Sequence, residues 1–350
     1  MGDLVSDRLF HLFQVSLRAI TTLGAKVELK ALYYDISYRY LAGMSDVAGI
    51  SGIHRRHSIQ TIKAAGERFI EVVCDDAHAG EPTCRIAALL VLSALVKMGR
   101  HENSKYMIES LGRLNFISIL VDSIQHISTD LRETAIEGTS SNTVLPHVHA
   151  LTESDIEMQL SYCHARLALL LQISQTRLGA VAVLNSGLLH SVKVSGLFAT
   201  DPDLGVGELS LTTVPVHLLI PSDIEGPDAI TKHYRLLAAV LRVICAAVLS
   251  RGSQNKQTLE QGRRFLSENR LSILAVLKKS AGLGNTSDIS EQSIDELADS
   301  FMLLMSVTGF LDVSILFSFF KIRLPKLTST SSRNRPIKKS KRTYLLHSRE

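Results

Sequence analysis

The sequence predicts an all-α protein in which the helices stack into an α-solenoid. Apolar side chains recur at helical spacing along most of the 350 residues, and no series of alternating strand patterns competes with them. Aromatic residues make up only 5% of the chain and Trp is absent, so Leu, Ile, Val and Ala must build the core. Residues 156–197 contain three short helical patterns in succession, and short helices that cannot bury their apolar faces alone have to stack.

The N-terminal block, residues 1–137, is predicted to hold six helices. Pro82 suits the first turn of one of them, where its missing N–H has no partner to lose, and Gly99 is the expected end of that helix. The long patterns in this block are typical of HEAT-like repeats. The predicted helices span residues 5–22, 25–43, 55–78, 82–99, 103–111 and 114–135.

The C-terminal block, residues 152–313, is predicted to hold seven helices. The first carries Leu160, Leu167 and Leu170 on one stripe and is apolar on most of its other faces, so it has to be buried on several sides. The three short helices near the start of the block look armadillo-like, and Pro227 marks the start of a long apolar helix. The predicted helices span residues 153–173, 177–185, 188–196, 228–250, 254–267, 269–280 and 290–310.

Three segments separate or follow the helices. Residues 138–151 form a polar linker between the two blocks, and residues 199–226 form an insertion rich in Pro and Gly. Loops of this length in a compact array are usually functional or disordered, so the insertion is either an ordered strap along the solenoid or a flexible excursion. Residues 314–350 form a divergent basic tail that we expect to be disordered.

The positive charge of the chain is concentrated at its C-terminal end. Residues 321–350 carry ten of the 38 Lys and Arg residues and a single acidic residue. The rest of the chain therefore has 28 basic and 33 acidic residues, and its net charge is near −5, although the whole chain has +4. A mildly acidic helical body lacks the basic face that nucleic-acid binding requires, so we expect no direct nucleic-acid partner.

Four basic residues after Pro336 resemble a nuclear-import signal: Lys338, Lys339, Lys341 and Arg342. The alternatives are a basic tail that no receptor reads, or a surface patch for acidic lipid or RNA. Few aromatic residues interleave these charges, so base stacking would contribute little to RNA binding.

No catalytic or metal-binding pattern stands out. His147 and His149 form an HxH pair, but no third ligand follows at a spacing typical of a metal site. Residues 54–57 (HRRH) are more typical of a solvated helix start than of a phosphate site. The 4 cysteines form no CxxC pair and lie in apolar helical patterns, as small buried thiols do in a reducing compartment. We therefore expect no enzyme, no metal ion, no cofactor and no small-molecule substrate.

Residues 301–320 (FMLLMSVTGFLDVSILFSFF) are the strongest competing signal, because about twenty apolar residues can cross a bilayer. Asp312 would be costly inside such a span, and the first part of the run also fits a buried solenoid helix. A helical membrane-anchored protein is therefore one alternative, and membrane contact is expected only if this run is a genuine span.

Several groups of residues occur in an order that resembles the C-terminal region of the large inner-ring scaffold nucleoporins, the 192/205 kDa class of nuclear pore adaptor proteins. The groups are residues 166–168 (RLA), 175–180 (QTRLGA), 184–189 (LNSGLL), 233–237 (HYRLL), 265–266 (FL) and 273–274 (IL). The motifs cover about residues 150–313, and residues 1–149 resemble the family in their helical texture.

This resemblance implies an α-solenoid scaffold of the nuclear pore complex at the nuclear envelope. It implies that the chain docks other inner-ring nucleoporins, supports nucleocytoplasmic transport and performs no catalysis. Members of the family are much longer, so we expect the chain to be a C-terminal piece that departs from the family after Ser314. A generic armadillo or HEAT adaptor with unrelated partners is the second alternative.

Segments of partner proteins would bury apolar anchors in grooves between the helices. We expect such grooves beside Leu188 and Val192, and along Leu236, Val240 and Val243 on the long apolar helix after the insertion. The same five residues also fit the chain's own core, so the sequence leaves both roles open.

Overall fold

The structure, a computed structural model, is all-helical over the residues that it describes. These are residues 2–22, 27–46, 52–139, 153–199, 227–252, 254–281 and 291–310. Within these ranges every regular element is an α-helix and no strand occurs. The all-α class predicted from helical periodicity is therefore confirmed.

The N-terminal half contributes seven helices to the described part of the chain. Pro82 occupies the first position of its helix, as predicted. The bounds are α1 (Gly2–Thr22), α2 (Val27–Asp46), α3 (Gly52–Ala65), α4 (Glu67–Ala79), α5 (Pro82–His101), α6 (Tyr106–Arg113) and α7 (Phe116–Thr139).

The C-terminal half contributes seven more helices to the described part. Three of them follow one another with almost no linker, as the pattern over residues 156–197 predicts. The bounds are α8 (Glu153–Ser174), α9 (Arg177–Asn185), α10 (Leu188–Ser195), α11 (Pro227–Arg251), α12 (Lys256–Glu268), α13 (Arg270–Ser280) and α14 (Glu291–Thr308).

Two glycines correct the predicted helix ends. The pattern over residues 55–78 predicts one helix, but the structure divides it at Gly66, which has a φ of +80° that residues with a side chain rarely adopt. Gly99, the expected end of α5, lies inside that helix, which continues to His101. Both errors have one cause. Apolar periodicity does not record where the backbone turns, and glycine only permits a turn.

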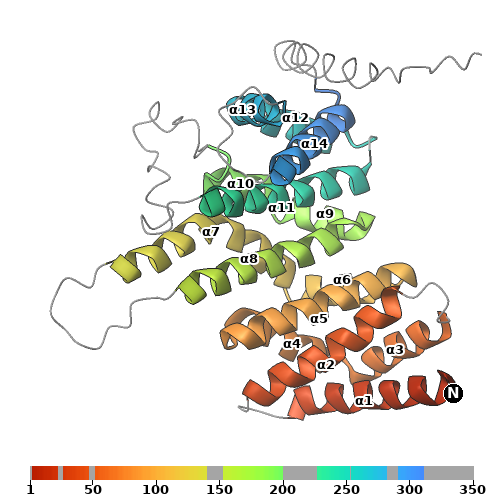
Figure 1. The fold of residues 1–350 in the computed structure, drawn as a ribbon. Coiled ribbons are helices and arrows are strands. Elements are labelled where there is room, and N and C mark those ends of the chain that lie inside the picture. The colour runs from red at the N-terminus through yellow and green to blue at the C-terminus, as the bar shows by residue number, and fades with distance from the viewer. Residues whose placement is uncertain are drawn as a thin grey trace, which may run out of the picture.

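The helices stack in layers that follow the order of the chain. α2 packs on α1 and α5, α5 packs on α8, α8 packs on α11, and α11 packs on α14. Figure 1 shows this stack running from α1 at one end to α12, α13 and α14 at the other. Because each layer packs mainly on its neighbours, the predicted solenoid is confirmed.

Direct packing between α5 and α8 joins the two halves of the stack. Tyr162 on α8 lies at this seam, and its hydroxyl donates a hydrogen bond to the Ala77 carbonyl at 3.1 Å. The guanidinium groups of Arg85 and Arg166 lie 5.1 Å and 4.3 Å from the centroid of the Tyr162 ring. Such cation–π contacts contribute about 0.5–1 kcal/mol each at exposed sites. One side chain of α8 therefore contacts both α5 and the C-terminal end of α4.

Within the described ranges, two helices are long and apolar enough to cross a membrane by length and composition: α5 and residues Thr231–Arg251 of α11. The bent pair of α9 and α10 passes the same test together. In the two single helices, 56% and 61% of the apolar window is buried inside the stack, which accounts for their hydropathy. The run over residues 301–320 does not form one continuous helix, because α14 ends at Thr308 and Gly309 turns with a φ of +63°. Phe301 is fully buried, so the first part of that run is a solenoid helix.

Several predictions fall on residues outside the described ranges. The sequence predicts a linker at residues 138–151, but residues 138 and 139 belong to α7, which extends to Thr139. Residues 140–151 lie outside the described ranges. The insertion 199–226 is described only at Ala199. The tail 314–350, with the import-like residues around Lys338, lies entirely outside. The division into two blocks and the roles of these segments stay predictions.

Candidate docking surface

The five residues predicted to bind partners lie inside the chain's own core. Leu188, Val240 and Val243 are fully buried, and Val192 and Leu236 are 1% and 2% exposed. The three residues of α11 lie where that helix packs against α8, α9 and α14, so those helices fill the space that an open groove along α11 would need. The five residues therefore contribute to the chain's own core, and their role in partner binding stays a prediction.

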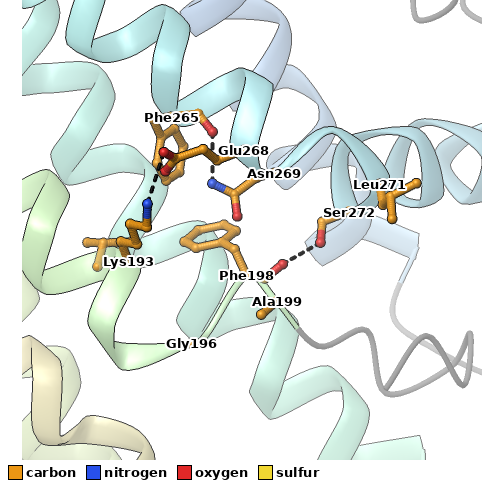
Figure 2. A pocket seen from close by; sticks show the side chains of 10 residues that line it. Lys193, Gly196, Phe198, Ala199, Phe265, Glu268, Asn269, Leu271 and Ser272 are labelled. Carbon is orange, nitrogen blue, oxygen red and sulfur yellow. Dashed lines mark hydrogen bonds and ion pairs between the residues drawn. The ribbon is translucent and has the colours of Figure 1, made fainter. Parts of the chain in front are cut away.

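A hollow does lie beside Val192, between the C-terminal end of α10 and the helices α12 and α13. Its volume is about 490 Å³. Volumes of roughly 300–1,000 Å³ are usual for sites that hold small ligands. Figure 2 shows that its lining side chains come from all three helices and from the short segment that follows α10.

The floor of this hollow is aromatic. Gly196 ends α10 in the left-handed conformation, with a φ of +66°, and the turn carries Phe198 into the core. The Phe198 ring packs edge to face against Phe265 of α12, with centroids 5.5 Å apart, and against Phe301 of α14 at 6.1 Å. The Ser272 hydroxyl on α13 donates a hydrogen bond to the Phe198 carbonyl and holds the turn in place. Side chains from α12, α13, α14 and the segment after α10 thus fix the floor.

The rim of the hollow is charged. Lys193 Nζ on α10 donates to Glu268 Oε1 on α12 at 3.0 Å, and Arg264 Nε donates to the same oxygen at 3.1 Å. The hydrogen bond from Lys193, followed by the one from Arg264, holds the pKa of Glu268 below its ordinary value. The carboxylate is therefore ionised at neutral pH and closes the rim between α10 and α12.

A second hollow of about 230 Å³ adjoins the first, because both are lined by Lys193, Phe265 and Glu268. It adds Leu189 and His190 of α10 to the lining. The two hollows together are called the α10–α12 groove below. The ion pair between Lys193 and Glu268 lines both hollows, and the aromatic floor lies beneath it (Figure 2).

Leu271 forms part of the wall of the larger hollow and is 65% exposed. The prediction from sequence missed this residue. It lies in the first turn of α13, whose buried face is formed by Ile273, Val276 and Leu277. A leucine outside the apolar stripe of its helix is the signal that could have identified this wall.

The other candidate sites in the sequence are the HRRH sequence, possible metal ligands and the cysteines. Arg55, in the HRRH sequence of α3, pairs with Glu102 just after α5, with its Nε 2.9 Å from the carboxylate. Within the described ranges, no group of three or more His, Cys, Asp or Glu side chains is arranged to hold a metal ion. All four cysteines are buried free thiols. Burial raises the pKa of Cys74 and Cys245 to about 12, so neither is a reactive thiolate at neutral pH.

Comparison with known proteins places this arrangement in a family. Residues 1–308 match the family "Nuclear pore complex scaffold, nucleoporins 186/192/205", and the match ends at the last residue of α14. The chain is also 34% identical over 366 aligned positions to nucleoporin NUP192 of Chaetomium thermophilum. That alignment covers 89% of this chain and 20% of the relative, so the chain spans a fifth of the length of that protein.

Proposed function

The chain belongs to the nuclear pore complex scaffold family of nucleoporins 186/192/205, and from that premise we propose that it is a structural scaffold component of the nuclear pore complex. The observation that carries the proposal is the family match over residues 1–308, which spans every helix of the described part. Because the chain covers 20% of the length of its Chaetomium relative, the partners and the role of the longer protein are part of the proposal.

The proposed role is mechanical. The stacked helices hold docking surfaces for other inner-ring nucleoporins at fixed positions at the nuclear envelope, and in this way they support nucleocytoplasmic transport. A solenoid suits this role because each added layer extends the surface without enlarging a closed core. The α10–α12 groove supports the docking part of the proposal, since an apolar floor between two helices is the arrangement that receives amphipathic segments. The proposal includes no catalysis, cofactor or small-molecule substrate.

A fluorescently tagged chain in cells tests this proposal. We expect a punctate signal at the nuclear rim, and we expect affinity purification of the tagged chain at physiological salt to recover other inner-ring nucleoporins. The tag alone is the control for both measurements. A diffuse signal together with no recovered nucleoporin would contradict the scaffold function, and recovery of unrelated partners would favour the generic adaptor.

A truncated chain separates the scaffold from the membrane-anchored alternative. Residues 1–310 keep every described helix but remove the second part of the apolar run and the basic tail. If docking surfaces on the solenoid hold the protein at the pore, the truncated chain keeps its signal at the nuclear rim. Release of the truncated chain from the membrane fraction, with loss of the rim signal, would instead favour a membrane anchor.

A further inference from the structure

The apolar part of the α10–α12 groove has room for a side chain from outside the chain. The hollow of about 490 Å³ has the rings of Phe198 and Phe265 on its floor. Leu271 at its wall is 65% exposed, whereas Ile273 on the same helix is fully buried. Covering an exposed leucine next to an aromatic floor is favourable because it removes apolar surface from water. An aromatic side chain suits this space best, since it can add another edge-to-face contact to the two rings.

A polar acceptor lies next to the aromatic floor. Asn269 Nδ2 donates a hydrogen bond to the Phe265 carbonyl at 2.8 Å. This bond orients the side-chain amide so that its oxygen points toward Phe198 and the hollow, as Figure 2 shows. The oxygen is therefore in position to accept a hydrogen bond from the backbone N–H of a bound segment.

The charges around the groove favour an acidic occupant. Lys193 and Arg264 both donate to Glu268, so two positive charges surround one negative charge. Arg264 makes this contact through Nε, and its side chain is 77% exposed. The terminal amino groups of an exposed guanidinium are well placed to bind a second carboxylate from a partner.

We propose that the α10–α12 groove binds a short acidic segment of a partner protein, with one aromatic side chain in the hollow and a carboxylate on Arg264 and Lys193. The proposal rests on the scaffold function proposed above and specifies the chemistry of one docking site. The two can fail separately, because a solenoid can dock nucleoporins through other surfaces.

Panning a random 12-residue peptide library, displayed on phage, against the full chain tests the proposal. We expect the enriched peptides to share one aromatic residue flanked by Asp or Glu. One enriched peptide, labelled with fluorescein, is then titrated with the chain and followed by fluorescence polarisation. Its affinity is expected to fall several-fold when the salt concentration rises from 50 mM to 300 mM, because part of the contact is between exposed charges.

Two pairs of variants separate binding in the groove from a general surface effect. Leu271→Ser and Arg264→Glu are each expected to weaken binding of the labelled peptide at least tenfold. Leu303→Ser is the matched control for the first, because Leu303 on α14 is 45% exposed and lines neither hollow. Arg39→Glu is the matched control for the second, because Arg39 is also 77% exposed and also pairs with an acid four residues away, Asp35. Both controls are expected to bind within twofold of the unmodified chain.

Thermal unfolding of the four variants checks that each retains the fold. Enrichment of basic peptides, of peptides without an aromatic residue, or of no peptides at all would overturn the proposal. Equal binding by Leu271→Ser, Arg264→Glu and the unmodified chain would overturn it too. Concentration-dependent self-association that Leu271→Ser abolishes would identify a second copy of the chain as the occupant instead. A chain that fails these tests and still recovers inner-ring nucleoporins keeps the scaffold function through other surfaces.

Discussion

Gly179 controls how closely the end of α8 approaches the start of α9. A Cβ at this position would lie 2.1 Å from the carbonyl oxygen of Ile173 and 2.8 Å from its carbonyl carbon. The Gly179 N–H also donates to the Thr176 hydroxyl at 3.0 Å, which caps α9. Since the two helices are separated by only two residues, the missing side chain is what lets the capped turn lie against the previous helix.

Gly179→Ala is expected to lower the free energy of unfolding by about 3 kcal/mol, because the clash is with backbone atoms that cannot rotate away. The control is Gly112→Ala in α6, where an added Cβ meets nothing within 4 Å. That variant is expected to raise the free energy of unfolding by about 0.5 kcal/mol, since alanine restricts the unfolded chain. Urea denaturation followed by circular dichroism measures both. Equal stability of the two variants would show that the turn before α9 has room to relax.

The ends of the helices were predictable where a local chemical signal marks them. The sequence predicts a helix over residues 177–185, and α9 has these bounds because Thr176 caps its start and Gly187, with a φ of +88°, follows its end. The break at Gly66 was missed, because the apolar pattern continues through it. Gly66 lies between two alanines and a glutamate, and this sequence fits a glycine tolerated inside a helix as well as it fits a glycine that ends one.

The groove was only half predictable. The residues beside Val192 were expected to border it, but the opposite side comes from Phe265 and Glu268. Lys193 and Glu268 are separated by 75 positions in the sequence. Periodicity records which face of one helix is apolar and carries no information about which distant helix will lie opposite it. Sequence reasoning therefore finds the faces of a solenoid more easily than it finds the spaces between them.

Tyr162 on α8 contacts both α4 and α5, and two substitutions separate its hydrogen bond from its ring contacts. Tyr162→Phe removes the hydrogen bond to Ala77 and keeps the ring under Arg85 and Arg166, so it is expected to cost about 1 kcal/mol. Tyr162→Ala also removes the ring and is expected to cost roughly 3 kcal/mol. Urea denaturation of both variants measures the difference. Equal losses would show that the ring adds nothing to stability beyond the hydrogen bond to Ala77.

The stack as a whole is arranged so that distant layers share few neighbours. α5 packs on α2, α4 and α8, whereas α11 packs on α8, α9 and α14. α8 packs on both α5 and α11, and the packing of α6 on α9 and of α7 on α10 provides further routes between the two ends. In such an array stability is approximately the sum of the layers and the interfaces between successive layers, instead of one property of a single core.

This arrangement predicts that core damage stays local. Leu92 on α5 and Leu241 on α11 are both fully buried, so replacing either by alanine is expected to remove about 2–5 kcal/mol of stability. Hydrogen exchange measured by mass spectrometry should then locate the loss, because exchange reports the opening of each region separately. Leu92→Ala is expected to speed exchange in α2, α4 and α5 and to leave α12, α13 and α14 unchanged. Leu241→Ala is expected to speed exchange in α9, α11 and α14 and to leave α1 to α4 unchanged. If either variant speeds exchange throughout the chain, the helices unfold as one cooperative unit, and layer-by-layer stability is wrong for this protein.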